Sequence, residues 1–433
     1  DTMEPLRAGI PALGVEGEPV IPFELLHLED EPARHRQRSE AFARKAFPRI
    51  ETPAVEPPGK RPEKLRVGYF SADFADHATL YLMIRFFELH DRSRFEVHAF
   101  CNTPGDGGAM RERLRKVVDG YHQIADKSDT EVAALARQLP LDIAVDLKGY
   151  TQRARLGVFA YRPAPISVTW IGYPGTTGAP FMDYLIGDAT VTPATHEQHY
   201  SESIIRLPGS YQVNDNTRAI ATHAPGRQES GLPEQGFVFC CFNNNNKISP
   251  DEFDVWMRLL DHVPGSVLWL FKSNEWARDN LRAQAERRGI APERLVFAEK
   301  LPLAEHLARV TLADLFLDTF NYNAHTTASD ALWAGVPVVT KLGEGFAARV
   351  AASLLRAVGL DELVTTSVTE YEQLALALAG DPTRLGTLKQ TIMEARSTAP
   401  LFDSERTTRD VETAYDTIYQ RWLDGEAPTA LDV

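Results

Sequence analysis

The chain has 433 residues, enough for two or three domains of ordinary size, and 43% of them are apolar and 24% charged. This balance excludes a wholly disordered chain, a collagen and a coiled coil, and no uncharged apolar run approaches the ~20 residues of a membrane span. The 46 lysine and arginine residues against 60 acidic residues give a net charge of −14, so nucleic acid and anionic membranes are not expected partners.

The first 60 residues are predicted to be a helical lead-in followed by a linker. Residues 32–46 are rich in arginine and alanine and predict one helix, whereas the prolines within residues 47–63 are typical of a linker. The chain begins with Asp1 rather than methionine, and no signal-peptide pattern follows. We therefore expect a processed chain or a part of a longer protein.

Residues 61–225 are predicted to form a first α/β domain. Short apolar runs alternate with helical patterns along this stretch, which is typical of a parallel sheet with crossover helices. The predicted strands are residues 65–70, 95–101, 143–147 and 166–171, and the predicted helices are residues 79–89, 110–118, 130–138 and 154–161.

Residues 226–400 are predicted to form a second domain of the same kind, after a polar connection over residues 212–235. We expect two doubly wound, Rossmann-like domains that face each other across a cleft, with ligands at the carboxyl ends of the strands. Residues 401–433 are predicted to be a C-terminal helix (407–422) and a tail. The second domain's predicted strands are residues 236–242, 267–271, 295–297, 315–317 and 337–339, and its helices are residues 250–262, 275–288, 303–311 and 326–334.

The three cysteines give no disulfide framework, because Cys240 and Cys241 are neighbours in an apolar run and only Cys101 remains. A reducing compartment fits them, and we expect a cytoplasmic protein. The sequence contains no phosphate loop, no GxSxG, no HExxH and no CxxC motif. His196 and His199 lack further metal ligands nearby, so we expect no metal site.

The segment from Asp318 to Pro337 has the order strand, polar loop, helix, strand. The predicted helix opens with His325, Thr326 and Thr327, and free amides at a helix N-terminus favour an anion such as a diphosphate. Asp330 follows one turn later, where a carboxylate can accept hydrogen bonds from a ribose. A threonine-capped helix without a ligand explains the pattern equally well.

Two further polar groups of the second domain are candidates. Residues 243–247 follow the domain's first strand, and Lys247 there can meet a phosphate, although a solvated turn also accounts for it. His306 and Arg309 share one helix face and can flank a base ring, or simply belong to a surface helix.

The first domain also has candidates at strand ends. His77 follows the first strand, where an imidazole could take a proton, or could be purely structural. The loop 172–178 follows a later strand, and its glycines permit a close backbone approach to a ligand, with Tyr173 as a possible wall of a sugar site.

Together these segments resemble one family, the catalytic region of the protein O-linked N-acetylglucosamine transferases in its bacterial form. The resemblance runs from about residue 65 to residue 422, and residues 1–60 are similar to the segment that follows helical repeats in such proteins. The matching stretches are LRVGYFSADFADH, RPAPISVTWIGYPGTTGAPFMDY, VPGSVLWL, HTTASDALWAGVPVVT and RVAASLL.

The resemblance implies a GT-B fold, in which two Rossmann-like domains face a cleft, and an inverting transfer of N-acetylglucosamine from UDP-N-acetylglucosamine to serine or threonine hydroxyls of proteins. It implies that no metal or other cofactor takes part, and that helical repeats absent from this chain help to select acceptors. The implied donor contacts are Asn244, Lys247, His325, Thr326 and Thr327 at the phosphates, Asp330 at the ribose, and His306 and Arg309 at the uridine.

On the acceptor side, the resemblance assigns Gly172, Tyr173 and Pro174 to a loop near the sugar, and His77 to a position once proposed as the general base. A donor phosphate oxygen or a water chain to Asp76 are the other candidates for the base. Our hypothesis is that His77 mainly positions donor and acceptor. The chain departs from the animal enzymes in having Asn244 for a glutamine and Ala78 for a proline, and in lacking their long insert before residue 236.

Four alternatives remain open on the sequence. A sister plant-type enzyme uses GDP-fucose, but that branch typically lacks the residues that match His325 and Asp330. UDP-glucose as the donor is poorly separated from UDP-N-acetylglucosamine. A UDP-sugar-binding homologue without turnover and a sugar epimerase of the same architecture are the other two, since fold does not determine function. The acceptor proteins and the oligomeric state are not readable from the sequence.

Overall fold

The computed structural model describes residues 8–47, 50, 57, 59–223 and 225–433. The chain divides into two compact units. The first unit comprises Asp1–Asn216 and Asp403–Val433, and the second unit is Thr217–Phe402. The division thus falls after residue 216 rather than after residue 225, and the C-terminal segment belongs to the first unit. Within the predicted linker, Pro48, Pro53 and Pro58 lie outside the described residues.

The first unit contains an all-parallel sheet with the strand order β14-β7-β6-β5-β4-β1-β2-β3. The strand order reverses at β1, which lies between β2 and β4. The neighbouring strands β1 and β4 therefore mark the topological switch point of the sheet. The described strands are β1 (Leu65–Ser71), β2 (Phe95–Cys101), β3 (Gly120–Gln123), β4 (Ile143–Asp146), β5 (Ile166–Thr169), β6 (Tyr184–Asp188), β7 (Ser203–Leu207) and β14 (Leu431–Asp432).

The first unit follows the predicted alternation of strands and helices, and the clearest departures are one helix and one strand that are shorter than predicted. The predicted helix 154–161 is reduced to the short helix Gly157–Ala160, and the positive φ values of Arg153 (61°) and Arg162 (49°) exclude a longer right-handed helix on either side. The predicted strand 166–171 ends early, because Ile171 turns away with a φ of 64°. The helices are α2 (Pro32–Ala46), α3 (Ala78–Leu89), α4 (Gly108–Arg115), α5 (Asp129–Gln138), α6 (Gly157–Ala160) and α14 (Ser404–Leu423).

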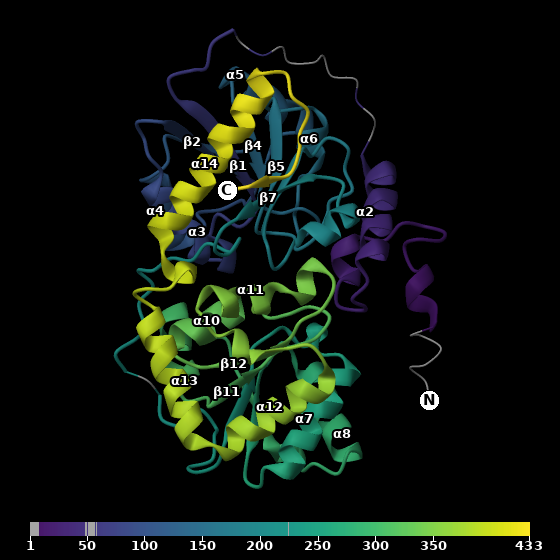
Figure 1. Ribbon diagram of the computed structural model, residues 1–433, viewed down its shortest axis with the longest axis vertical. Coiled ribbons are helices and arrows are strands. Elements are labelled where there is room, and N and C mark those ends of the chain that lie inside the picture. The colour runs from purple at the N-terminus through teal and green to yellow at the C-terminus, as the bar shows by residue number, and fades with distance from the viewer. Residues whose placement is uncertain (1–7, 48–49, 51–56, 58, 224) are drawn as a thin grey trace. The chain divides into compact units, whose positions relative to one another are not determined.

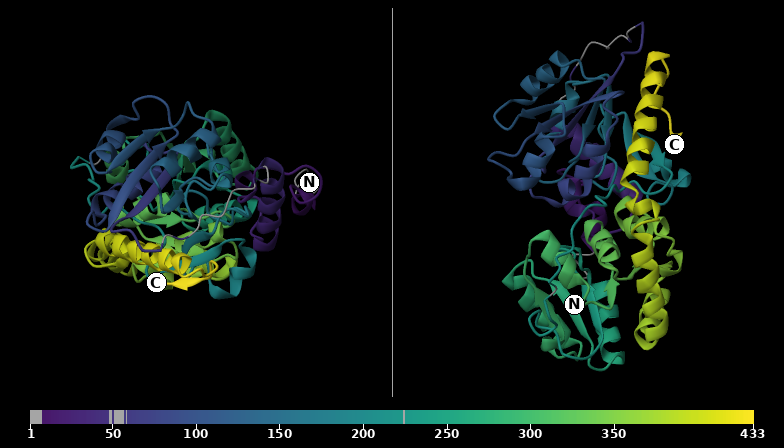
Figure 2. Two further views of the ribbon diagram at one scale, coloured as in Figure 1. Left: turned by 90° about the horizontal axis from the view of Figure 1, so that it is seen from above. Right: turned by 90° about the vertical axis from the view of Figure 1, so that its left-hand side faces the viewer.

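Helix α14, the yellow helix of Figures 1 and 2, packs on α3 and β7 of the first unit. Its fully buried Glu412 accepts hydrogen bonds from His90 Nδ1 at 3.0 Å and from the Asp91 amide at 2.7 Å. The Tyr69 hydroxyl donates to His90 Nε2 at 2.9 Å, so a polar chain links the helix to β1. Because these contacts are buried, the C-terminal helix is an integral part of the first unit and not a separate tail.

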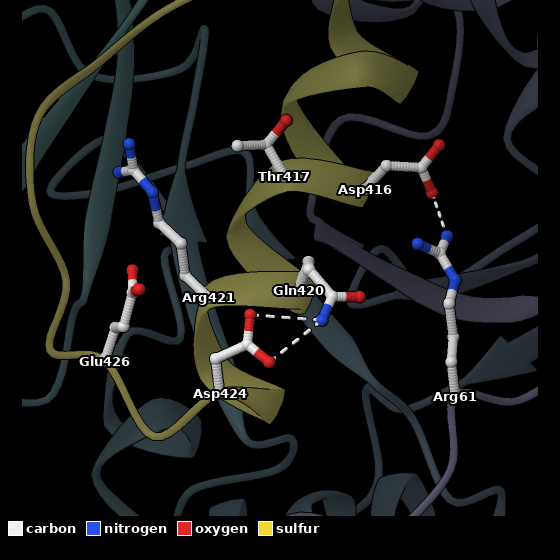
Figure 3. Close-up of a pocket in the computed structure, with 7 residues that line it drawn as sticks. All are labelled: Arg61, Asp416, Thr417, Gln420, Arg421, Asp424 and Glu426. Carbon is white, nitrogen blue, oxygen red and sulfur yellow. Dashed lines mark hydrogen bonds and ion pairs between the residues drawn. The ribbon is translucent and has the colours of Figure 1, made fainter.

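A hollow of about 350 Å³ lies beside the C-terminal half of α14 (Figure 3). Arg61 pairs there with Asp416, and the Gln420 amide donates to Asp424 at 3.1 Å. Of the hollow's charged groups, Arg61 and Asp416 pair with each other, and Asp424 accepts from the neutral Gln420 side chain.

The second unit contains another all-parallel sheet, with the strand order β10-β9-β8-β11-β12-β13. Figure 1 shows α10 and α11 on one side of β11 and β12, and α7 and α12 on the other, so that helices cover both faces. The strands are β8 (Val238–Cys241), β9 (Val267–Phe271), β10 (Leu295–Ala298), β11 (Leu315–Leu317), β12 (Val338–Lys341) and β13 (Val364–Thr365).

The helices of the second unit lie close to their predicted positions, and the C-terminal part of the unit resolves into three further helices. In the part of the chain that the structure describes, no helix combines the length and apolar character needed to cross a membrane. The helices are α7 (Pro250–His262), α8 (Glu275–Arg287), α9 (Leu303–Val310), α10 (Thr326–Ala334), α11 (Val350–Ala357), α12 (Val368–Gly380) and α13 (Pro382–Ala395).

Candidate active site

Two polar loops of the second unit meet at the carboxyl edge of its sheet. One follows β8 and the other follows β11, and these strands are neighbours although 76 residues separate their ends in the sequence (Cys241 and Leu317). The strand order reverses at β8, so the two loops lie at the topological switch point, where ligands of open α/β sheets bind. The structure therefore brings together two motifs that the sequence analysis selected independently.

Hydrogen bonds join the two loops. Asn243 Nδ2 donates to Thr319 Oγ1 at 2.9 Å, and the Thr327 hydroxyl donates to Asn243 Oδ1. Lys247 Nζ donates to the Asn323 carbonyl oxygen at 3.0 Å. The fully buried Asn243 side chain thus fixes the start of α10 against the loop that carries Lys247.

The electrostatics of Lys247 are unusual for a lysine. Its ammonium group lies 3.6 Å from the centroid of the Tyr322 ring, a cation–π contact, and burial lowers its pKa to about 8. Among the described residues, no carboxylate forms an ion pair with this group, although the more distant Asp318 favours its charged form. A partly buried cation without an anionic partner is a natural site for an anion.

Asp318 shapes the loop below this lysine. Its carboxylate is fully buried and accepts hydrogen bonds from the amides of Thr319 (2.8 Å) and Ala324 (2.6 Å) and from the Thr340 hydroxyl (2.7 Å). Burial raises its pKa to about 7. Asp318 is thus engaged with its own loop and shapes it.

The N-terminus of α10 opens directly beside this loop. His325 is the N-cap residue without a side-chain capping bond, so the first amides of the helix, those of Thr326 and Thr327, have no side-chain cap at this position. His325 Nε2 is 3.3 Å from the Ala347 carbonyl oxygen, and burial together with the Lys247 charge holds the pKa of His325 well below its usual value. The imidazole is therefore neutral at physiological pH and does not compete with Lys247 for the role of the cation.

His306 and Arg309 lie on α9, beside the end of β8. Arg309 Nε donates to His306 Nδ1 at 3.1 Å, and the His306 ring packs edge-on against Phe242 with centroids 5.2 Å apart. Burial lowers the pKa of His306 to about 4 and that of Arg309 to about 10. The pair presents a neutral imidazole next to a fixed guanidinium, as the shared helix face predicted.

Asp330 lies one turn into α10, and the structure gives it a partner that the sequence analysis missed. Arg218 Nη1 donates to Asp330 Oδ1 at 2.6 Å, and both side chains are almost fully buried. Arg218 belongs to the polar stretch that the sequence analysis treated as a connection between domains. The signal that could have found it is the buried acid, which requires a cation from elsewhere in the chain.

Asn244 lies at the exposed rim of the same site. Its Oδ1 accepts a hydrogen bond from the Ser273 hydroxyl at 3.1 Å, which ties the loop after β8 to the end of β9. The amide nitrogen of the same side chain, Nδ2, is a potential hydrogen-bond donor.

In the first unit, His77 is the N-cap of α3. Its Nδ1 accepts the Thr79 amide at 3.2 Å, and half of its side chain is exposed. A neutral ring that caps in this way carries its proton on Nε2, so the outer nitrogen is a donor and not a base. Lys148 Nζ donates to Asp73 Oδ2 at 2.7 Å close by, which places this pair and His77 at the β1–β4 switch point of the sheet.

The loop of Gly172, Tyr173 and Pro174 departs from expectation in one respect. The Tyr173 ring is only 4% exposed, and its hydroxyl lies 3.4 Å from Ser39 of α2. Its side chain is thus packed in the core and cannot be the wall of an open sugar site. The reason is the strained Ile171, whose positive φ turns the chain inward, with Gly172 against the Leu147 carbonyl. Pro174 is buried as well, and Gly172 is the residue of these three that stays partly exposed.

Side chains that could bind a metal ion are not clustered among the described residues. No group of three or more His, Cys, Asp or Glu side chains is arranged there so as to hold a metal ion. His196 and His199 contact each other, with ring centroids 5.7 Å apart.

We expect diphosphate affinity to fall above pH 8. The Lys247 pKa of about 8 lies below its ordinary value of 10.5, so the lysine loses its charge as the pH rises through 8, while a bound diphosphate requires that charge. Titration of the chain with UDP at pH 7, 8 and 9 should show affinity falling by up to about tenfold per pH unit at the upper end.

The Lys247→Arg variant is the matched control, because a guanidinium keeps its charge throughout this range. Its affinity should vary little between pH 7 and pH 9. An unmodified chain with equally constant affinity would contradict a lysine–phosphate contact.

Comparisons with known proteins give matches in both sequence and fold. The sequence profile described as "Glycosyl transferase family 41" matches residues 53–225 and 218–411. The Arabidopsis thaliana protein named "Probable UDP-N-acetylglucosamine--peptide N-acetylglucosaminyltransferase SEC" is 36% identical over 372 residues, which cover 84% of this chain and 38% of that protein. The Solanum lycopersicum protein named "Probable UDP-N-acetylglucosamine--peptide N-acetylglucosaminyltransferase SPINDLY" is 35% identical over 383 residues, which cover 86% of this chain and 40% of that protein. The chain thus spans about two fifths of these relatives.

A solved structure gives the same result for the fold. A mutant of the Thermobaculum terrenum O-GlcNAc transferase superposes with a TM-score of 0.85 at 31% identity, over 93% of this chain and 78% of that one. The predicted fold class, two doubly wound units of the GT-B kind, is confirmed by this match and by the two parallel sheets.

Proposed function

The chain belongs to glycosyl transferase family 41, and we propose that it is the catalytic region of an enzyme that moves N-acetylglucosamine from UDP-N-acetylglucosamine to serine or threonine hydroxyls of proteins. The observation that carries the donor half of this proposal is Lys247, a partly buried cation without a carboxylate partner beside the N-terminus of α10. The enzyme names of the relatives support the sugar and the peptide acceptor.

The proposed diphosphate site combines one positive charge with two kinds of hydrogen-bond donor. Lys247 supplies a full charge, the first amides of α10, including that of Thr327, supply aligned dipoles, and the Thr326 hydroxyl supplies a further donor. The Thr327 hydroxyl already donates its proton to Asn243. In the transfer, the bond from the anomeric carbon to the diphosphate breaks, and negative charge builds on the leaving oxygen. Donors that are already in place stabilise this charge without reorganisation, and we propose that they do so without a metal ion or another cofactor.

The nucleoside is proposed to bind next to this site. Asp330 would accept hydrogen bonds from the ribose, and His306 and Arg309 would flank the uracil at the end of β8. Asn244 would reach the phosphates from the rim. These positions are compatible with one bound nucleotide, since β8 and β11 are neighbouring strands and α9 contacts α10.

We propose a single displacement with inversion on the acceptor side. The hydroxyl oxygen of the acceptor forms its bond to the anomeric carbon as the bond to the diphosphate breaks, and the hydroxyl proton leaves to a base. The capping tautomer of His77 has no free acceptor nitrogen, which supports a positioning role for this histidine. A donor phosphate oxygen or a water chain to Asp76 remains as the acceptor of the proton.

The His77→Ala variant is expected to lower turnover by about 10- to 100-fold, because misplacement of reacting groups by ~1 Å costs about 100-fold. His77→Asn restores a side-chain acceptor at the helix N-cap and should recover thermal stability but not turnover. Transfer kinetics and thermal unfolding of both variants measure this separation. Near-normal turnover of His77→Ala would exclude an essential role.

The acceptors are proposed to be proteins or peptides selected with the help of helical repeats outside this chain, since the chain spans about two fifths of its relatives. The three cysteines are buried free thiols, and we propose the cytoplasm as the compartment in which the enzyme works.

A transfer assay tests the function directly. The chain is incubated with a mixed serine- and threonine-containing peptide library, EDTA and one of three donors: UDP-N-acetylglucosamine, UDP-glucose or GDP-fucose. We expect modified peptide and free UDP with the first donor. Preference for another donor would move the assignment to that sugar, and binding of UDP-sugar without transfer or hydrolysis would indicate a binding homologue. A change at C2 of the sugar would indicate an epimerase.

A further inference from the structure

The ion pair between Arg218 and Asp330 joins a residue of the proposed donor site, Asp330, to an arginine that the proposed chemistry does not yet use. Arg218 lies in the segment that enters the second unit, whereas Asp330 lies in α10, 112 residues later. The side chains are 2% and 7% exposed, respectively. A buried ion pair is expensive to desolvate and is weak evidence for stability, so its presence beside a ligand site calls for another explanation.

Helix α10 holds Arg218 at three points. The Asp330 carboxylate pairs with the guanidinium, and Trp333, three residues later on the same helix face, packs its ring 5.3 Å from the guanidinium carbon. The Trp333 indole nitrogen also donates to the Arg218 carbonyl oxygen at 3.2 Å. Both the backbone and the side chain of Arg218 are therefore fixed, and the guanidinium has little freedom relative to the carboxylate.

The pair constrains how Asp330 can act. The Arg218 contact is to Oδ1, and a carboxylate offers about four acceptor positions on its two oxygens, so one contact leaves capacity for further donors. Burial raises the pKa of Asp330, and the Arg218 charge opposes this rise. Without the guanidinium, the buried group would be a poorer hydrogen-bond acceptor for hydroxyl groups, because its charged form would be uncompensated.

The position of Asp330 suits a neighbour of the diphosphate. It lies four residues after Thr326, which is one helical turn, or about 5–6 Å, along α10 from the proposed phosphate site. The group next to a diphosphate in a nucleotide is the ribose, which carries two hydroxyl donors. Resting on the proposed function, we infer that Arg218 is a positioning residue that holds the Asp330 carboxylate as the acceptor for the ribose hydroxyls of the donor.

Three ligands separate this role from a general structural one. UDP carries ribose hydroxyls and a diphosphate, 2′,3′-dideoxy-UDP lacks the hydroxyls, and inorganic pyrophosphate lacks the nucleoside. We expect the unmodified chain to prefer UDP to dideoxy-UDP by about 10- to 100-fold, the range for hydrogen bonds to a charged group. In Arg218→Met this preference should fall below about threefold, with affinities for dideoxy-UDP and pyrophosphate nearly unchanged.

Further variants make the test decisive if Arg218→Met folds poorly. Arg218→Lys keeps the charge but not the planar fork, and should retain an intermediate preference. Asp330→Asn should lose the preference, and Arg218→Met combined with Asp330→Asn should bind UDP no more weakly than Asp330→Asn alone, since Arg218 acts through Asp330. Arg294→Met is the matched control, because Arg294 bonds the Ser266 and Val263 carbonyls before β9, at the opposite edge of the sheet.

The outcomes are distinguishable. A preference for UDP that survives in folded Arg218→Met, or an equal loss of all three ligands, would overturn the role of Arg218 while leaving the proposed function intact. Failure of the unmodified chain to bind UDP or pyrophosphate would overturn the proposed function and this inference together. Calorimetry gives the affinities, and thermal unfolding of each variant establishes that it is folded.

Discussion

Lys247→Ala is expected to lower the rate of sugar transfer by about 100- to 1000-fold, the loss seen when one preorganised donor to a developing negative charge is removed. Lys247 is the full positive charge of the proposed diphosphate site, and its ammonium group is already desolvated against the Tyr322 ring. Water therefore screens it less than a surface lysine, and the contact is correspondingly strong. Initial rates with UDP-N-acetylglucosamine measure the effect.

Lys272→Ala provides the control for this prediction. Lys272 follows β9, the neighbouring strand, but its ammonium group is paired with Glu275 and Glu299. Its removal should change the rate by less than about threefold, since an exposed paired charge contributes little. A rate for Lys247→Ala within threefold of the unmodified chain would remove the main support for the donor site.

Glu412→Ala is expected to destabilise the first unit by about 3–5 kcal/mol, the range for breaking a buried charged contact. The change leaves the His90 Nδ1–H and the Asp91 amide, which both donate to this carboxylate, without their partner in the core. For a unit of this size, the loss corresponds to a fall in melting temperature of roughly 6–20 °C. Thermal unfolding followed by circular dichroism measures it.

Glu405→Ala is the matched control on the same helix. Glu405 is exposed in the first turn of α14, and its loss should cost less than about 1 kcal/mol. An equal effect of the two substitutions would show that α14 is not anchored through Glu412. Loss of stability with full UDP affinity in Glu412→Ala is also expected, because the donor site lies in the second unit.

The alternation of strands and helices was predictable from the sequence because buried parallel strands appear as short apolar runs, as over β8, β9 and β11. The two loops of the proposed donor site were predictable for the same reason, since each follows such a run. The contact between the two loops was not predictable, because it depends on β8 and β11 being neighbours, and no local sequence pattern determines the strand order.

The errors and omissions have physical causes. The positive φ of Ile171 ends a predicted strand early, and an isoleucine does not signal such a conformation. The inward turn of Tyr173 follows from that strain and from packing against α2. Arg218 was missed because a single arginine in a polar stretch looks solvated, and only its partner, Asp330, shows that it is buried.

Calorimetric titration of the chain with UDP and with GDP, in the presence of EDTA, tests the central claim most directly. The account predicts that UDP binds at one site per chain, at least tenfold more tightly than GDP, and that Lys247→Ala abolishes the binding. Absence of UDP binding, or a preference for GDP, would contradict the assignment of a uridine diphosphate site to the carboxyl ends of β8 and β11.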